Sequence, residues 1–116
     1  IAKSGTANAG GDALKYAGSV IGGKFGGRIT ITKDNAIVQG VSIVSSNIGS
    51  QAISVNANGV MVTGCNINVS SGTYPAIKEA DGKNHNLFAN NIVNRSIVIV
   101  GAQSVAVNNI DTRVTA

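Results

Sequence analysis

Five short segments of the chain resemble one another, and this internal repeat constrains the fold more than any other feature of the sequence. A period of about 20 to 50 residues indicates a solenoid, in which each unit buries its apolar face against the next. The segments read SVIGGKF, IVQGVSI, MVTGCNI, NLFANNI and SVAVNNI. When they are aligned, one aliphatic column consists of Val20, Val38, Val62, Leu87 and Val105. A second apolar column consists of Phe25, Ile43, Ile67, Ile92 and Ile110.

Small and polar residues separate the two apolar columns, which lie five positions apart. A straight strand alternates its side chains between two faces, so residues five apart cannot both point inward. A corner between two short strands can satisfy both columns. Small residues followed by Asn favour such a corner, because Asn tolerates left-handed backbone angles. We therefore place Asn90 and Asn108 in the corner column with Cys65, and we expect their side chains to form a hydrogen-bonded ladder.

A third strand is predicted upstream of each later segment, at residues 29–31, 53–55, 77–80 and 97–99. The separation from the first Ile of this strand to the corner column is 12, 12, 13 and 11 residues. The extra residue in the third case predicts a bulge that turns Ala80 inward and Glu79 outward. Polar turns separate these strands from the next ones, so each coil contains three short strands. The turns lie at 33–35, 56–59, 81–84 and 101–104.

The coils are unequal in length, at 18, 24, 25 and 18 residues, and the variation has one source. The second and third coils carry extra loops at one shared corner, at residues 44–52 and 68–76, which we expect to lie one above the other. The predicted fold is all-β, a right-handed single-stranded parallel β-helix of about five coils of three short strands. It occupies residues 19–116. Residues 1–18 are a lead-in or an N-terminal cap, with a short helical stretch around Leu14 and Tyr16.

Composition excludes several classes of function. The nine Lys and Arg residues give a net charge of +4 but form no run and no cluster with aromatic residues, which argues against a nucleic-acid surface. No segment approaches the roughly 20 apolar residues of a membrane span, so membrane insertion is not expected. The single Cys65 excludes an internal disulfide and is interpreted as a small buried residue. His85 has no partner ligands nearby in the sequence, so no metal and no cofactor is expected. The chain lacks an initiator Met and a signal-like segment, which suggests a piece of a longer chain.

The patterns VxGCxI at 62–67 and LxANNI at 87–92 resemble the rungs of the pectin-lyase-like right-handed β-helix superfamily. That superfamily includes polysaccharide lyases, glycoside hydrolases and trimeric phage tailspikes. The resemblance covers residues 19–116, and its rung patterns identify a fold more than a family; no catalytic motif transfers. It implies a fragment or terminal domain of an oligomer in which three chains bury their aliphatic flanks against one another.

Two acids are the candidate catalytic residues. Glu79 and Asp81 lie in the densest polar stretch of the chain, 78–85, and two outward-facing carboxylates could act as acid and base in polysaccharide cleavage. Lys78 or His85 would tune them. The alternative interpretation is a solvated turn with local charge pairs.

The two loops are the candidate ligand-binding site, because loops on a rigid scaffold commonly carry binding. Their polar groups suit sugar hydroxyls, and Tyr74 could stack on a sugar ring. The candidate ligand-binding residues are Asn47, Ser50, Gln51, Ser71, Thr73, Tyr74 and Lys78. The alternative roles are a subunit contact or surface decoration.

The leading functional hypothesis is a non-catalytic β-helical segment of a homotrimeric virion or cell-surface fibre, similar to a phage tailspike, for host attachment and assembly. Surface polysaccharide is the candidate ligand, and a virion tail or an extracellular surface is the expected location. One alternative is a fragment of a polysaccharide lyase or glycoside hydrolase that uses Glu79 and Asp81. Another is a segment of a bacterial adhesin passenger.

Overall fold

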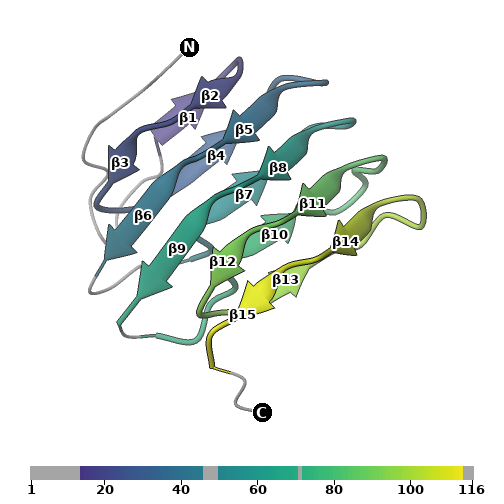
Figure 1. Cartoon of the computed structure of the whole chain (residues 1–116). Helices are drawn as coiled ribbons and strands as arrows, with labels where there is room; N and C mark the ends of the chain where they lie inside the picture. The colour runs from purple at the N-terminus through teal and green to yellow at the C-terminus, as the bar shows by residue number, and fades with distance from the viewer. Residues whose placement is uncertain (1–13, 46–49, 71, 114–116) are drawn as a thin grey trace.

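The computed structural model describes residues 14–45, 50–70 and 72–113, which form five stacked coils of three short strands each. All strand pairs are parallel, and the strands of successive coils form three sheets that run the length of the stack (Figure 1). The predicted parallel β-helix is therefore confirmed, and the described residues contain no helix.

The three sheets each take one strand from every coil. The first sheet holds β1 (Leu14–Tyr16), β4 (Ile29–Ile31), β7 (Ile53–Val55), β10 (Ile77–Glu79) and β13 (Ile97–Val98). The second holds β2 (Val20–Ile21), β5 (Ile37–Gln39), β8 (Met61–Thr63), β11 (Leu87–Ala89) and β14 (Val105–Val107). The third holds β3 (Lys24–Phe25), β6 (Ser42–Ser45), β9 (Asn66–Val69), β12 (Ile92–Val93) and β15 (Ile110–Asp111). Figure 1 shows the second and third sheets side by side in front of the first.

The core lies between the sheets and consists of medium-sized aliphatic side chains stacked coil on coil. In the first sheet, Ile29, Ile53, Ile77 and Ile97 are aligned by strand register, which confirms the third predicted strand. Most of these side chains are fully buried. The interior also holds two aromatic rings, Phe25 and Phe88, which are both buried.

The predicted columns are correct in the first three coils and wrong by one residue in the last two. In the second sheet Val62 pairs with Phe88 rather than Leu87, and in the third sheet Ile67 pairs with Val93 rather than Ile92. Leu87, Val105, Ile92 and Ile110 therefore lie on the outer face, because a shift of one residue reverses the direction of every side chain in a strand.

The left-handed corner residue explains this register. The same corner position has a positive φ in every coil, between 56° and 71°, and it holds Gly in the first three coils and Asn in the last two. The residues are Gly22, Gly40, Gly64, Asn90 and Asn108. Gly and Asn are the residues that tolerate this conformation best, so the corner sets the register of the strands on both sides.

The predicted asparagine ladder exists, but it is formed by Asn91 and Asn109, one residue after the predicted positions. Asn91 Oδ1 accepts the backbone N–H of Cys65 at 2.9 Å, and Asn109 Oδ1 accepts that of Asn91 at 3.0 Å. Asn90, at the left-handed position, is exposed. The inward-facing position therefore supplies the ladder because only its side chain can reach the neighbouring coil from inside.

The bulge predicted at 77–80 is absent, and the expected outward orientation of Glu79 is wrong. Glu79 pairs in register with Val55, and its side chain is fully buried. The extra residues of this coil lie instead in the turn at 80–86, where Gly82 and His85 adopt positive φ angles of 80° and 60°.

The N-terminal segment is a strand and not a helix. Leu14–Tyr16 forms strand β1, which pairs with β4, so the short helix predicted around Leu14 and Tyr16 is wrong for these residues. Residues 1–13 lie outside the described part.

The bases of the two loops lie on adjacent coils as expected. Ser45 pairs with Val69, and the N–H of Ala52 donates to the carbonyl of Pro75 at 3.3 Å.

Candidate functional site

The Glu79 carboxylate forms the most extensively hydrogen-bonded buried site among the described residues. Its Oε1 accepts the backbone N–H groups of Val100 at 2.8 Å and Gly101 at 2.7 Å. Its Oε2 accepts Asn86 Nδ2 at 2.6 Å and the hydroxyl of Ser104. Four donors thus converge on one carboxylate, which joins the turn at 80–86 to the turn that follows β13.

The hydrogen bonds determine the charge of this carboxylate. Burial raises the pKa of Glu79, but the bonds from Ser104, Gly101, Asn86 and Val100 lower it and prevail, so its pKa lies below the ordinary value of 4.5. A carboxylate that accepts several hydrogen bonds is held in its ionised form. Glu79 is therefore a structural anion whose two oxygens are already occupied by donors from the chain.

The predicted acid pair does not converge on a common surface. Glu79 faces the interior, whereas Asp81 is exposed in the turn after β10. Lys78 and His85 also lie apart from the Glu79 carboxylate: Lys78 is on the outer face of β10, beside Ser54 and Val98, and His85 is exposed. Glu79 and Asp81 therefore do not face a substrate together.

The loop residues are brought together only in part. Ser50 and Gln51 are half-buried, and the Ser50 hydroxyl donates to Gln51 Oε1 at 2.5 Å. Thr73 and Tyr74 are exposed on the neighbouring coil, Tyr74 by 48%. Asn47 and Ser71 lie outside the described residues.

Arg95 holds the second loop in place, a role that the sequence did not reveal. Its Nε donates to the carbonyl of Gly72 at 2.9 Å, and its Nη1 donates to the carbonyl of Asn94 at 2.7 Å. Asn94 adds a bond from Nδ2 to the carbonyl of Val69 at 2.8 Å. Tyr74 is thus displayed on a loop that is anchored to the coil below it.

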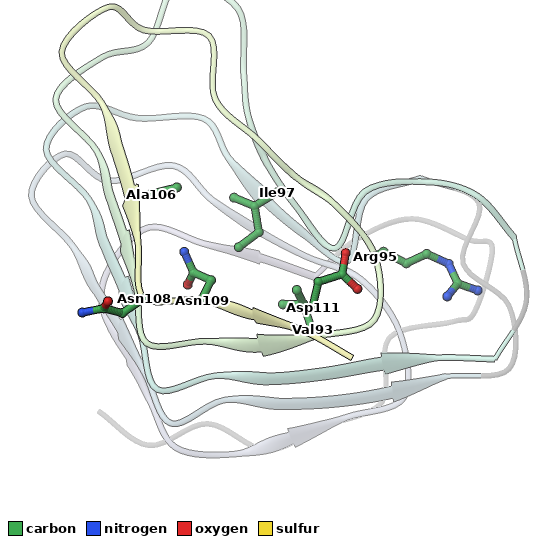
Figure 2. Close-up of a pocket in the computed structure, with 7 residues that line it drawn as sticks. All are labelled: Val93, Arg95, Ile97, Ala106, Asn108, Asn109 and Asp111. Atoms are coloured by element: carbon green, nitrogen blue, oxygen red, sulfur yellow. The ribbon is translucent and has the colours of Figure 1, made fainter. Parts of the chain in front are cut away.

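A pocket of about 330 Å³ lies at the C-terminal end of the stack, over the interior of the last coil. It is lined by Val93, Arg95, Ile97, Ala106, Asn108, Asn109 and Asp111. Figure 2 shows Ile97, Asn109 and Asp111 pointing into this space, whereas Arg95 and Asn108 point away from it. The pocket is therefore the open end of the core rather than a groove on the side of the molecule.

A charged pair lies at this open end. Arg113 Nη2 contacts Asp111 Oδ2 at 2.5 Å, and Arg113 Nε donates to Asp111 Oδ1 at 2.9 Å. These bonds lower the pKa of Asp111 to about 2. Asp111 occupies the inward column that continues from Val93, so the apolar column of the third sheet ends in a carboxylate.

A ladder of polar side chains runs along the turns after the first sheet. Asp34 Oδ1 accepts the N–H of Asn58, Asn58 Oδ1 accepts that of Asn84, and Asn84 Oδ1 accepts that of Gln103, each at 2.9 Å. These bonds confirm that Asp34 is a turn residue. The side chains of Asp34, Asn58 and Asn84 each link one coil to the next.

The comparisons with known proteins give no assignment, because no protein-family model, no curated protein and no solved structure matches the chain. Over residues 14–45, 50–70 and 72–113, no helix is long and apolar enough to cross a membrane. Nor does this part of the chain contain a group of three or more His, Cys, Asp or Glu side chains that could hold a metal ion.

Proposed function

We propose that the chain is a non-catalytic β-helical segment of a homotrimeric virion or cell-surface fibre, similar to a phage tailspike, that serves host attachment and assembly. The proposal that the segment is non-catalytic rests on the environment of Glu79. A general acid or base must reach the substrate, and it works best with a pKa near the operating pH. Glu79 is fully buried, accepts four hydrogen bonds and has a lowered pKa.

The remaining described acids support the same proposal. Asp34 accepts a hydrogen bond within the ladder of turns, Asp111 is paired with Arg113, and Asp81 is an exposed turn residue. Glycoside hydrolysis usually needs two facing carboxylates about 5 to 9.5 Å apart. The rung pattern that resembles the pectin-lyase-like superfamily is consistent with such a non-catalytic member.

Attachment would use the two loops at the shared corner. Tyr74 and Thr73 are exposed on a loop anchored by Arg95, and Gln51 lies on the coil before it. An exposed aromatic ring beside amide and hydroxyl groups suits the faces and hydroxyls of a sugar. We expect surface polysaccharide as the ligand.

Mass measurement tests the oligomeric part of the proposal. Size-exclusion chromatography with light scattering at micromolar concentration should give three times the chain mass of 11.6 kDa. A stable monomer under these conditions overturns the fibre.

Binding and turnover on a panel of capsular and plant polysaccharides test the rest. We expect binding without cleavage, weakened at least tenfold by Tyr74→Ala and unchanged by Thr30→Ala on the first sheet. Absence of binding to every member of the panel overturns attachment through a polysaccharide. Cleavage that is abolished by Asp81→Asn overturns the non-catalytic assignment.

A further inference from the structure

The turn between β7 and β8 contains the dipeptide Asn58-Gly59, and Asn58 is the one Asn in the chain that is followed by Gly. Asparagine is a thermolabile residue in proteins, because its side-chain amide can be lost. The loss begins when the backbone nitrogen of the next residue attacks the side-chain amide carbon. Gly hinders this attack least, because it carries no Cβ and its backbone is the most mobile. The turn therefore contains the dipeptide of this chain that is chemically most prone to deamidation.

Both members of this dipeptide take part in contacts between coils. Gly59 has a positive φ of 69°, and a Cβ at this position would collide with Asn35 Oδ1 in the turn of the preceding coil. Asn58 belongs to the turn ladder: its N–H donates to Asp34 Oδ1, and its Oδ1 accepts the N–H of Asn84, each at 2.9 Å. The fold thus places a reactive dipeptide at a position where its two residues connect three coils.

The reacting atoms are hydrogen-bonded in the folded chain. The N–H of Gly59, whose nitrogen would attack, donates to the carbonyl oxygen of Asn84 at 3.2 Å. Asn58 Oδ1, on the amide that would be attacked, accepts the N–H of the same Asn84. Asn84 therefore holds both the nucleophile and its target from the next coil. A backbone N–H that is bonded in this way becomes available only when the structure opens locally.

We propose that Asn58 is a deamidation site of this chain and that its rate is set by the opening of the two hydrogen bonds to Asn84. Asn58 is exposed, so water and hydroxide reach it from solvent. After opening, hydroxide removes the proton from the Gly59 nitrogen, which forms a bond to Cγ of Asn58. The bond from Cγ to Nδ2 then breaks, and ammonia leaves with a proton from water. One water molecule next opens the resulting succinimide ring at either of its two carbonyls, and nothing is oxidised or reduced. The proposal is independent of the function proposed above.

The two products differ in their effect on the turn ladder. Opening at one carbonyl gives an aspartate, which retains an oxygen that can accept the N–H of Asn84. Asp34 shows that a carboxylate serves in this ladder, because it accepts the N–H of Asn58 one coil earlier. Opening at the other carbonyl gives an isoaspartate, in which the main chain runs through the former side chain and is one carbon longer. That extra carbon displaces Gly59 from Asn84 and separates the turns of the two coils.

Incubation of the whole chain at mildly alkaline pH, folded and in concentrated urea, tests the control by Asn84. Mass spectrometry of proteolytic peptides measures the conversion at position 58. Asn56, which is followed by Ala in the same turn, is the internal control. We expect conversion at Asn58 to be at least tenfold slower in the folded chain, and conversion at Asn56 to be negligible in both states. Equal rates at Asn58 in the two states, or faster conversion at Asn56, overturn the proposal.

Gly101→Ala tests the same control without denaturant. Its Cβ would lie 2.9 Å from Cα of Asn84, so the turn that shields the reactive dipeptide is displaced. We expect Asn58 to convert at least threefold faster in Gly101→Ala, whereas Gly18→Ala, whose Cβ meets no atom within 4 Å, should leave the rate unchanged. An unchanged rate in Gly101→Ala with a native circular dichroism spectrum contradicts the control by Asn84.

The deamidated chains themselves test the effect on the ladder. Ion-exchange chromatography separates them from unreacted chains, because each carries one more negative charge, and enzymatic methylation of isoaspartate measures the share of that product. We expect the Tm of the deamidated fraction to fall as its isoaspartate share rises, whereas Asn58→Asp should melt together with the unaltered chain. An isoaspartate-rich fraction that melts together with the unaltered chain shows that the ladder is not broken and overturns this part of the proposal.

Discussion

Asn109 Oδ1 accepts two hydrogen bonds from Asn91, one from its backbone nitrogen and one from its Nδ2, each at 3.0 Å. Asn91 in turn bonds the backbone of the coil before it, through its Oδ1 to Cys65 and through its Nδ2 to the carbonyl of Val62 at 3.1 Å. One fully buried side chain thus joins three successive coils.

Replacement of Asn91 by Ala should destabilise the chain by about 3 kcal/mol, because it removes the side-chain bonds and leaves the N–H of Cys65 without its acceptor in the interior. Urea unfolding followed by circular dichroism measures the change. The matched control is Asn90→Gly at the left-handed corner, which should change stability by less than about 0.5 kcal/mol because Gly adopts a positive φ readily. Equal effects of the two substitutions would contradict the structural role of the inward Asn.

Glu79→Gln should destabilise the chain at neutral pH by about 2 kcal/mol, because charge-assisted bonds are lost and one carboxylate oxygen becomes an NH2 group facing donors. Since the pKa of Glu79 is lowered in the folded chain, its contribution to stability is present above the ordinary value of 4.5 and is lost as the pH falls through the folded value. Urea midpoints between pH 7 and pH 2 should therefore fall less steeply in Glu79→Gln. The exposed Asp81→Asn is the control and should retain the steep fall; a variant curve parallel to that of the unaltered chain argues against an ionised Glu79.

Gly101→Ala should destabilise the chain by about 2 kcal/mol. A Cβ at this position would lie 2.6 Å from the carbonyl oxygen of Lys83 and 2.5 Å from Asn84 Oδ1, so the backbone of two turns must move apart. Gly18→Ala, whose Cβ would have no atom within 4 Å, should be neutral or slightly stabilising. Thermal unfolding compares the two, and a smaller loss at Gly101 than at Gly18 would be inconsistent with the close approach.

Arg113→Gln should raise the pKa of Asp111 from about 2 towards its ordinary value of 3.8, because hydrogen bonds from Arg113 are the main cause of the lowering. Carboxyl chemical shifts followed by NMR between pH 1 and pH 6 measure this. Substitution of Arg95, which contributes only a weak charge effect, should shift the pKa of Asp111 much less. An unchanged pKa in Arg113→Gln would show that the pair does not persist in solution.

The sequence was sufficient to predict the coil architecture because apolar columns repeat wherever strands face a shared core. The register of the last two coils could also have been predicted, by aligning Asn90 and Asn108 with Gly64 as residues that tolerate a positive φ. Alignment of the apolar residues gave the wrong register for these two coils, because Ile92 and Ile110 are apolar and yet face outward. In a strand of only two residues, the sequence does not distinguish an exposed aliphatic residue from a core residue.

The environment of Glu79 was beyond prediction from the sequence. Acidic residues are seldom buried without partners, so an outward orientation was the reasonable expectation. Its donors Val100, Gly101 and Ser104 lie 21 to 25 residues further along the chain, on the next coil. Two of these donors, Val100 and Gly101, are backbone N–H groups, which every residue type except proline carries, so the sequence does not mark them.

The turn ladder from Asp34 through Asn58 and Asn84 to Gln103 connects each coil only to its immediate neighbours. A coil in the middle of the stack therefore has the same bonding partners whatever the total number of coils. Duplication or deletion of one coil would change the height of the molecule by about 4.8 Å, and only the coils next to the change would meet a new neighbour. The chain is in this sense a spacer of graded length, whose reach can change by whole coils without redesign of the core.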